Sequence, residues 1–249
     1  MRLFASFVPM TALIPLLAMA QGETSVQEKV KLRLASKAGE LTKYTVQATI
    51  TPVETSFPFE VKMTMKMEDK VLKVLPDGNT EIETKMTGGT LAFGEQETEM
   101  PGDAGVRKST IGPDGITISK SGETWDEEFD LRLTRAIETP YPKNEVAVGE
   151  TWQFEHKADP ERGWRGGTVT AKLLAIEVID GIRCAKIEHR FKEKPFRDDA
   201  GSYDCMMTYW IDLASGGVVR GEGVLQGFVN QQMGSTSPMK MTMKISRTK

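Results

Sequence analysis

The sequence predicts a mainly β protein, a curved antiparallel sheet or half-barrel that carries one amphipathic helix. Three observations predict it: apolar and polar residues alternate along most of the 249-residue chain, turn-forming residues separate the alternating runs, and one segment repeats its apolar residues every four positions. Alternation with a period of two is typical of a strand with one buried and one solvated face, and such strands normally pair antiparallel.

The first twenty residues have a different character from the rest of the chain. Arg2 supplies a positive start, an apolar run extends from Leu3 to Leu17, and Ala18-Met19-Ala20 is a small-x-small cleavage pattern. Together they predict a secretory signal peptide at 1–20 and a mature chain at 21–249 that is periplasmic or secreted. The run is too short for a permanent transmembrane helix. No later apolar run is long enough to span a membrane.

The alternating runs are the main signal for strands. Their apolar members are Val30, Leu32 and Leu34; Tyr44, Val46, Ala48 and Ile50; Phe59, Val61, Met63, Met65 and Met67; and Met239, Met241, Met243 and Ile245. Turn sequences between runs predict hairpins, because glycine and Asx residues tolerate the positive φ of tight turns. These turns are Pro76–Asn79, Gly112–Gly115, Asp180-Gly181 and Ser215-Gly216.

One segment breaks this period. Trp125, Phe129, Leu133 and Ile137 recur at four-residue steps behind a cluster of acids, which predicts an amphipathic helix over 125–138. A strand through Phe129 and Leu133 is the competing interpretation. The polar stretch 97–105 is expected to be a loop.

The helix divides the mature chain into two similar halves, 28–122 and 140–249. Ala38-Gly39-Glu40 in the first half resembles Val148-Gly149-Glu150 in the second, and the Asp-Gly hairpins follow in the same order. This pattern indicates a structural duplication within a single β domain. The alternative is that any two β meanders look alike at this level.

Composition narrows the function classes. The formal net charge is −3, without a basic patch, so no nucleic-acid partner is expected.

The two cysteines, Cys184 and Cys205, are predicted to form a disulfide after export, provided that the strand register lets the sulfurs meet. No catalytic motif is present, and His156 and His189 lack a partner at motif spacing. We therefore expect a non-enzymatic protein without a cofactor or a metal site.

Methionine is the unusual residue of this sequence. The pentapeptide Lys-Met-Thr-Met-Lys occurs twice, at 62–66 and 240–244. The favoured interpretation is that the Met faces pack in a core or line an apolar pocket. Thioethers at this spacing could also hold Cu(I), although no cysteine or histidine joins either cluster.

Two short patterns resemble known families. Lys37–Glu40 leading to Tyr44, and Pro142 leading to Val148–Trp152, resemble a pattern in exported bacterial all-β proteins of unknown function. Tyr209–Gly216 is similar to the strand and turn of half-barrel carriers of the lipoprotein-carrier class, in which a curved sheet folds around a helix and holds acyl chains. These resemblances supply no catalytic residues, and no lipidation cysteine is present.

The leading functional expectation is an envelope protein that binds an apolar ligand or a lipidated partner on its concave face. The expected binding residues are Val61, Met63, Met65, Met67, Met241, Met243 and Ile245. A structural or protein-interaction β module without a ligand is the first alternative, and a Cu(I) site built from the Met pairs is the second.

Overall fold

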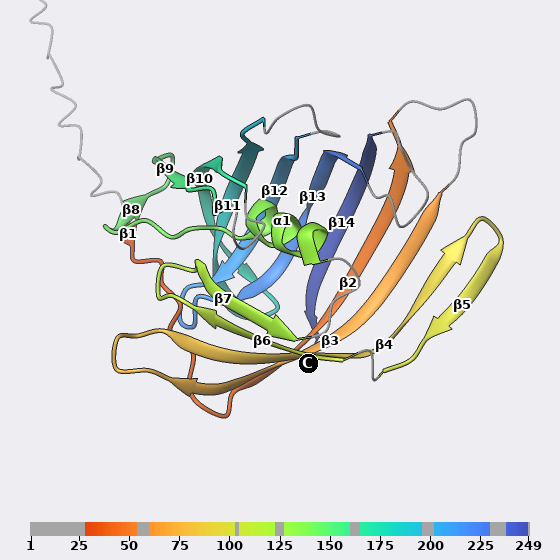
Figure 1. The fold of residues 1–249 in the computed structure, drawn as a ribbon. Helices are drawn as coiled ribbons and strands as arrows, with labels where there is room; N and C mark the ends of the chain where they lie inside the picture. The colour runs from red at the N-terminus through yellow and green to blue at the C-terminus, as the bar shows by residue number, and fades with distance from the viewer. Residues whose placement is uncertain are drawn as a thin grey trace, which may run out of the picture.

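The computed structural model describes residues 28–53, 60–102, 105–122, 127–159, 165–195, 202–229 and 238–248. One large sheet curves around a single helix (Figure 1). The described elements are β1 (Lys29–Val30), β2 (Leu41–Pro52), β3 (Val61–Val74), β4 (Thr80–Phe93), β5 (Gln96–Met100), β6 (Val106–Ile111), β7 (Thr117–Gly122), α1 (Glu127–Ile137), β8 (Val146–Ala147), β9 (Thr151–His156), β10 (Gly167–Ile179), β11 (Ile182–Glu193), β12 (Asp204–Asp212), β13 (Val218–Phe228) and β14 (Met239–Thr248). Strands β1 and β8 form a separate two-stranded sheet.

The predicted fold class is confirmed. The main sheet is antiparallel and runs β7-β6-β4-β3-β2-β14-β13-β12-β11-β10-β9, with β5 paired to β4, and it does not close into a barrel. Its first five strands come from the N-terminal half of the chain and its last six from the C-terminal half. The two halves meet where β14 pairs with β2.

The hairpin turns lie where the sequence predicts them. Asp77-Gly78 joins β3 to β4, Asp180-Gly181 joins β10 to β11, and Gly216 lies between β12 and β13. Gly78 and Gly216 adopt φ values of 86° and 72°, which explains why glycine occupies both turns.

Two local expectations were wrong. The expected loop at 97–105 contains strand β5, which pairs with the end of β4 and so satisfies backbone groups that a loop would leave to water. The alternating segment from Val30 to Leu34 forms only the two-residue β1, paired with β8. Val30 and Leu32 are nevertheless buried. Alternation therefore identified which side chains face inward, although the ladder ends early.

The expected helix is present as α1. Leu131 and Ala136 are buried, whereas Phe129, Leu133 and Ile137 pack against the core from partly exposed positions. Trp125, at the start of the expected 125–138 segment, lies outside the described residues. The helix crosses the concave face of the sheet, where it contacts β11 and β12 (Figure 1). We call the sheet face that carries α1 the concave face and the opposite one the convex face.

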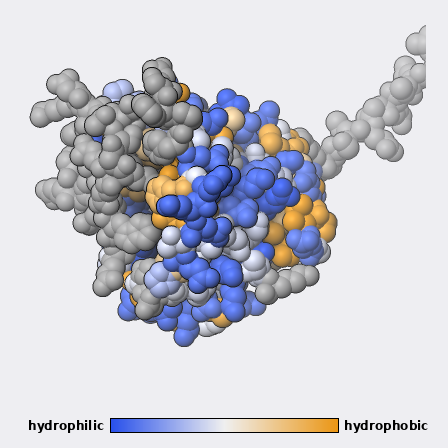
Figure 2. All heavy atoms as spheres, turned by 90° about the vertical axis from the view of Figure 1, so that its right-hand side faces the viewer, coloured by the Kyte–Doolittle hydropathy of each residue, from blue (hydrophilic) through white to orange (hydrophobic). Residues whose placement is uncertain are grey.

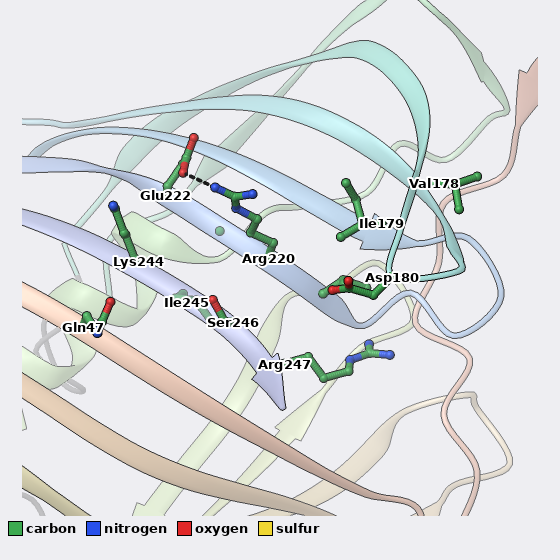
Figure 3. Close-up of a pocket in the computed structure, with 12 residues that line it drawn as sticks. Gln47, Val178, Ile179, Asp180, Arg220, Glu222, Lys244, Ile245, Ser246 and Arg247 are labelled. Atoms are coloured by element: carbon green, nitrogen blue, oxygen red, sulfur yellow. Dashed lines mark hydrogen bonds and ion pairs between the residues drawn. The ribbon is translucent and has the colours of Figure 1, made fainter. Parts of the chain in front are cut away.

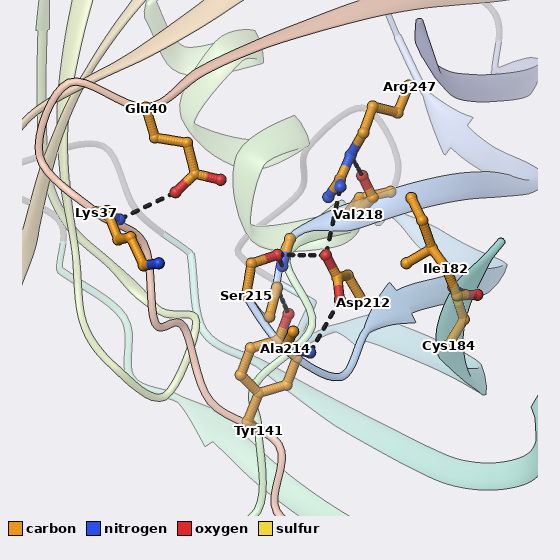
Figure 4. A network of polar contacts seen from close by, with 12 residues as sticks. Lys37, Glu40, Tyr141, Ile182, Cys184, Asp212, Ala214, Ser215, Val218 and Arg247 are labelled. Carbon is orange, nitrogen blue, oxygen red and sulfur yellow. Dashed lines mark hydrogen bonds and ion pairs between the residues drawn. The ribbon is translucent and has the colours of Figure 1, made fainter. Parts of the chain in front are cut away.

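The similar segments of the two halves make the same hydrogen bonds. The Gly39 N–H donates to Val71, and the Val71 N–H donates to Glu40; the Gly149 N–H donates to Leu173, and the Leu173 N–H donates to Glu150. The Glu40 carboxylate accepts the Lys37 N–H, and the Glu150 carboxylate accepts the Ala147 N–H, each at 2.9 Å. Figure 4 shows the Lys37–Glu40 contact. The duplication of the two halves stays a prediction.

The predicted disulfide is not present. Cys184 pairs with Asp212 across β11 and β12, whereas Cys205 pairs with Phe191 seven residues further along β11. At about 3.3 Å per residue the two cysteines are about 23 Å apart along the strands, far beyond the reach of a disulfide. The register also puts them on opposite faces. Both are free and buried, Cys184 in a small convex-side cluster with Trp210 and Val219.

Candidate ligand-binding face

The register brings the predicted binding residues together. Because β2 lies between β3 and β14, their side chains form rows across the concave face. The rows are Val61–Ile50–Met241, Met63–Ala48–Met243, Met65–Val46–Ile245 and Met67–Tyr44–Arg247. All seven predicted residues therefore share one face, although the row of Met67 ends in a charged residue, Arg247, beyond Tyr44.

Burial differs from one side of these rows to the other. On β14, Met241 and Met243 are 3% and 6% exposed and belong to the core. On β3, Met63, Met65 and Met67 are only partly buried, although they border the same core. The core is therefore filled where Val61, Met241 and Met243 pack, and the concave face opens toward solvent along β3 from Met63 to Met67.

Sequence reasoning missed the part of this face contributed by β4. Met86 pairs with Met67, Leu91 with Met63 and Phe93 with Val61, so each points to the concave side. Phe93 is 52% exposed. A β-bulge at Met67 and the Gly88-Gly89 pair interrupt the alternation that could have identified these residues. We call the set Met63, Met65, Met67, Met86, Leu91 and Phe93 the open apolar face.

Gly89 shapes this surface. A Cβ at position 89 would lie 2.9 Å from the terminal methyl of Met100 and 3.2 Å from the Cα of Met65. The absence of a side chain therefore lets Met100, on β5, reach across β4 toward Met65. Figure 2, which views the side of the molecule where β5 lies, shows hydrophobic areas among hydrophilic residues.

Helix α1 covers the filled part of the concave face and is held there by a buried ion pair. Arg132 donates to both carboxylate oxygens of Glu193, at 2.9 and 2.6 Å. The guanidinium lies 4.0 Å from the centre of the Tyr203 ring, and the Tyr203 N–H donates to the same carboxylate. Both charged side chains are nearly inaccessible to water.

A second group of contacts ties α1 to the opposite edge of the sheet. Asp130 forms ion pairs with Arg107 of β6 and Lys120 of β7, at 3.0 and 2.5 Å. The Lys120 ammonium also donates to Thr134. The helix therefore bridges β6–β7 and β11, two parts of the sheet that are far apart in strand order.

Both histidines lie on the sheet and contact this helix, His156 at Arg135 and His189 at Ala136. Burial lowers the pKa of His156 to about 3, with Arg135 adding to the effect, and lowers the pKa of His189 to about 4. The His189 Nε2 lies 2.8 Å from the Ala136 carbonyl, which can only accept, so this nitrogen carries the proton. Both imidazoles are neutral and enclosed. Their positions therefore suit packing against the helix better than proton transfer to a bound molecule.

Two further features are absent from the part of the chain that the structure describes. No cluster of three or more histidine, cysteine, aspartate or glutamate residues there could hold a metal ion. Among the same residues, no helix is both long and apolar enough to cross a membrane.

Comparison with solved structures gives distant likenesses. No family model matches the chain, and no curated protein matches it. A Bacteroides fragilis protein, named as exported and of YmcC-like fold, is 11% identical over 88% of this chain and 100% of its own, with a TM-score of 0.31. The hypothetical lipoprotein YmcC from Escherichia coli is 11% identical over 84% of this chain and 88% of its own, with a TM-score of 0.30. Likenesses of this strength assign no function to the chain.

Proposed function

We propose that this is an exported, non-enzymatic protein that binds an apolar ligand, or the lipid group of a partner, on the open apolar face. The observation that carries the proposal is the contrast between β3 and β14, the two strands that flank β2. Met241 and Met243 of β14 are buried in the core, whereas Met63, Met65 and Met67 of β3 remain partly exposed. The contrast is direct in the row Met63–Ala48–Met243. Export rests on the signal-like pattern of residues 1–20.

The composition of this face suits an apolar ligand of variable shape. Four of its six residues are methionine, and methionine adapts to irregular apolar surfaces. Burying a fully exposed side chain of this size contributes about 1.5–3 kcal/mol, and covering the exposed part of these half-buried side chains contributes a fraction of that before the entropic costs of binding are subtracted. An acyl chain laid along β3 would cover several of them.

The decisive experiment compares two lysine substitutions on adjacent residues of β3. Met65→Lys places a charge on the open apolar face, whereas Thr64→Lys, the matched control, places it on the convex face. Binding of a dansyl-labelled fatty acid is followed by fluorescence, and organic extracts of the purified protein are examined by mass spectrometry. We expect Met65→Lys to weaken binding about tenfold or more, Thr64→Lys to leave it within about twofold, and Met65→Leu to preserve it.

A clear result would contradict the proposal. If the wild-type protein binds no fatty acid and its extracts contain no lipid, the open apolar face is not a lipid site. The alternative of a protein-interaction module would then be favoured. Equal weakening by both lysine variants would likewise show that the effect is not specific to the concave face.

A Cu(I) site is the second candidate, favoured by the thioethers gathered near Gly89. Met67 pairs with Met86, and Met100 reaches across Gly89 toward Met65. Thioether sulfur is a ligand that Cu(I) prefers. Competition with a chromophoric Cu(I) chelator would test it: Met65→Leu with Met100→Leu should abolish copper retention, while Met239→Leu in the core should not.

A further inference from the structure

The two copies of Lys-Met-Thr-Met-Lys lie on either side of one strand. Residues 62–66 are in β3 and residues 240–244 are in β14, and β2 pairs with both. In each copy the methionines point to the concave face, so the lysines and threonine point to the convex face. The repeat therefore builds two surfaces, and the apolar-ligand proposal uses only the concave one.

On the convex face, the lysines form two parallel rails. Lys62 and Lys66 project from β3, and Lys240 and Lys244 project from β14. The convex-facing residues of β2 between them are Thr45, Gln47, Thr49 and Thr51, which have shorter side chains. Strands are about 4.8 Å apart, so the rails are about 10 Å apart, and lysines four residues apart are about 13 Å apart along a strand.

This difference in side-chain length produces a furrow. A hollow of about 360 Å³ is lined by residues of β3, β2, β14 and β13, including Lys62, Thr64 and Thr242. A second hollow, of about 440 Å³, continues toward the β10–β11 turn. Both are lined by Gln47, Lys244 and Glu222, which lie side by side in Figure 3. Of the four rail lysines, Lys62 and Lys244 line these hollows, and Lys66 and Lys240 extend the rails beyond them. We call the hollows and the two rails together the lysine furrow.

Part of the positive charge of the furrow has no ion pair within the described residues, although Glu222 lies opposite Lys244 in the register. Lys62 pairs with Glu60 at 2.7 Å, and Arg220 pairs with Glu222 at 3.1 Å. Among the described residues, no acidic group lies within ion-pair distance of Lys66, Lys240 or Lys244. These cations are concentrated on one face of a chain whose formal net charge is −3.

The donor groups of the furrow match one kind of ligand. Lysine ammonium groups only donate hydrogen bonds, and the threonine hydroxyls and the Gln47 amide can donate as well. A phosphate group offers several strong acceptor oxygens and negative charge, and lysine binds it as a point charge. We propose that the lysine furrow binds a phosphate-bearing anion, with phosphate groups contacting the two lysine rails across β2.

The test uses the full mature chain and two phosphate sources. One is vesicles of phosphatidylcholine with or without phosphatidylglycerol, followed by co-sedimentation, and the other is soluble polyphosphate, followed by calorimetry. Lys66→Glu with Lys244→Glu reverses the charge of both rails. The control, Lys108→Glu with Lys157→Glu, changes the net charge equally at exposed lysines outside the furrow.

We expect the wild-type protein to bind at low salt and to release its ligand as salt increases. The furrow variant should bind at least about tenfold more weakly, whereas the control should stay within about threefold. Binding to anionic vesicles alone identifies a lipid headgroup as the source, and binding to polyphosphate alone identifies a soluble phosphate compound. Either result supports the proposal.

Absence of binding to both probes would overturn the proposal, as would equal losses in the furrow and control variants. Circular dichroism shows whether each variant is folded, and Lys66→Gln with Lys244→Gln replaces the glutamate variant if that one is not. Because the furrow lies on the convex face, Met65→Lys should leave phosphate binding unchanged. The two proposals can therefore fail separately.

Discussion

Arg132 of α1 and Glu193 of β11 form a buried ion pair joined by two hydrogen bonds, although 61 residues separate them in the chain. The pair fixes the helix over β11 and β12, while Asp130 holds it to β6 and β7. The position of α1 decides which part of the concave face is filled core and which part stays open. The ion pair thus helps to define the proposed binding face.

Breaking this ion pair should destabilise the protein strongly. Arg132→Met leaves the Glu193 carboxylate buried without its partner, and we expect a loss of about 3–5 kcal/mol in the free energy of unfolding. Replacing both residues, by Arg132→Met with Glu193→Leu, should recover much of this loss because no lone charge remains. Urea denaturation measures both. A double variant less stable than the single one would contradict this explanation.

Stability should fall in mild acid because of His189. Its folded pKa is lowered to about 4, below the ordinary value of 6.5, so the unfolded chain takes up a proton at a higher pH than the native state. The stabilising contribution is present above pH 6.5 and is lost as the pH falls toward 4. We expect His189 to cost about 2 kcal/mol between pH 7.5 and pH 5.

The control for this effect is His189→Gln, whose stability should decrease less over the same pH interval. Urea denaturation of both proteins at the two pH values gives the difference. His156 and Glu138 are present in both proteins, so their contributions largely cancel in the comparison. Identical pH dependence in the two proteins would show that His189 is not the group responsible.

Met241 and Met63 should differ in their importance for stability, although both belong to the repeated pentapeptides. Met241 is 3% exposed, and Met241→Ala should cost about 2–5 kcal/mol because it leaves a cavity in the core. Met63 is partly exposed, so Met63→Ala should cost less than half as much. Thermal or urea denaturation measures the loss of stability in each variant. A larger loss for Met63→Ala than for Met241→Ala would show that Met63 is the more tightly packed residue and would contradict this description of the core.

Both cysteines should react as thiols once the protein is unfolded. Burial raises the pKa of Cys205 to about 12 and also raises that of Cys184, so the folded protein should react slowly with alkylating reagents. Under denaturing, non-reducing conditions we expect two labelled thiols per chain by mass spectrometry. A reducing agent should leave the melting temperature unchanged. An unlabelled chain whose mass is two hydrogens lower than that of the reduced chain would instead indicate a disulfide.

The equivalent glutamates of the two halves should make similar contributions to stability. Glu40→Ala and Glu150→Ala each remove a carboxylate that accepts a backbone N–H three residues earlier. We expect each to cost about 1 kcal/mol, with Glu145→Ala, at an exposed position, changing stability by less than about 0.5 kcal/mol. Unequal losses at 40 and 150 would count against structural equivalence of the halves.

Local sequence patterns accounted for much of this structure. Alternation identified which side chains of β2, β3 and β14 face the core, and Gly and Asx residues located the hairpin turns. The four-residue spacing of Phe129, Leu133 and Ile137 identified α1. These features are determined by the sequence because they depend on the backbone preferences and side-chain directions of residues that are neighbours in the chain.

Pairing between distant segments required the tertiary structure. The sequence did not show that β14 joins β2, that β3 and β4 remain partly uncovered, or that Cys184 and Cys205 lie far apart on opposite faces. Nor did it show that the two lysine pentapeptides flank a single strand. Each of these depends on strand register and on where α1 packs, and both are decided by contacts between residues that are far apart in the chain.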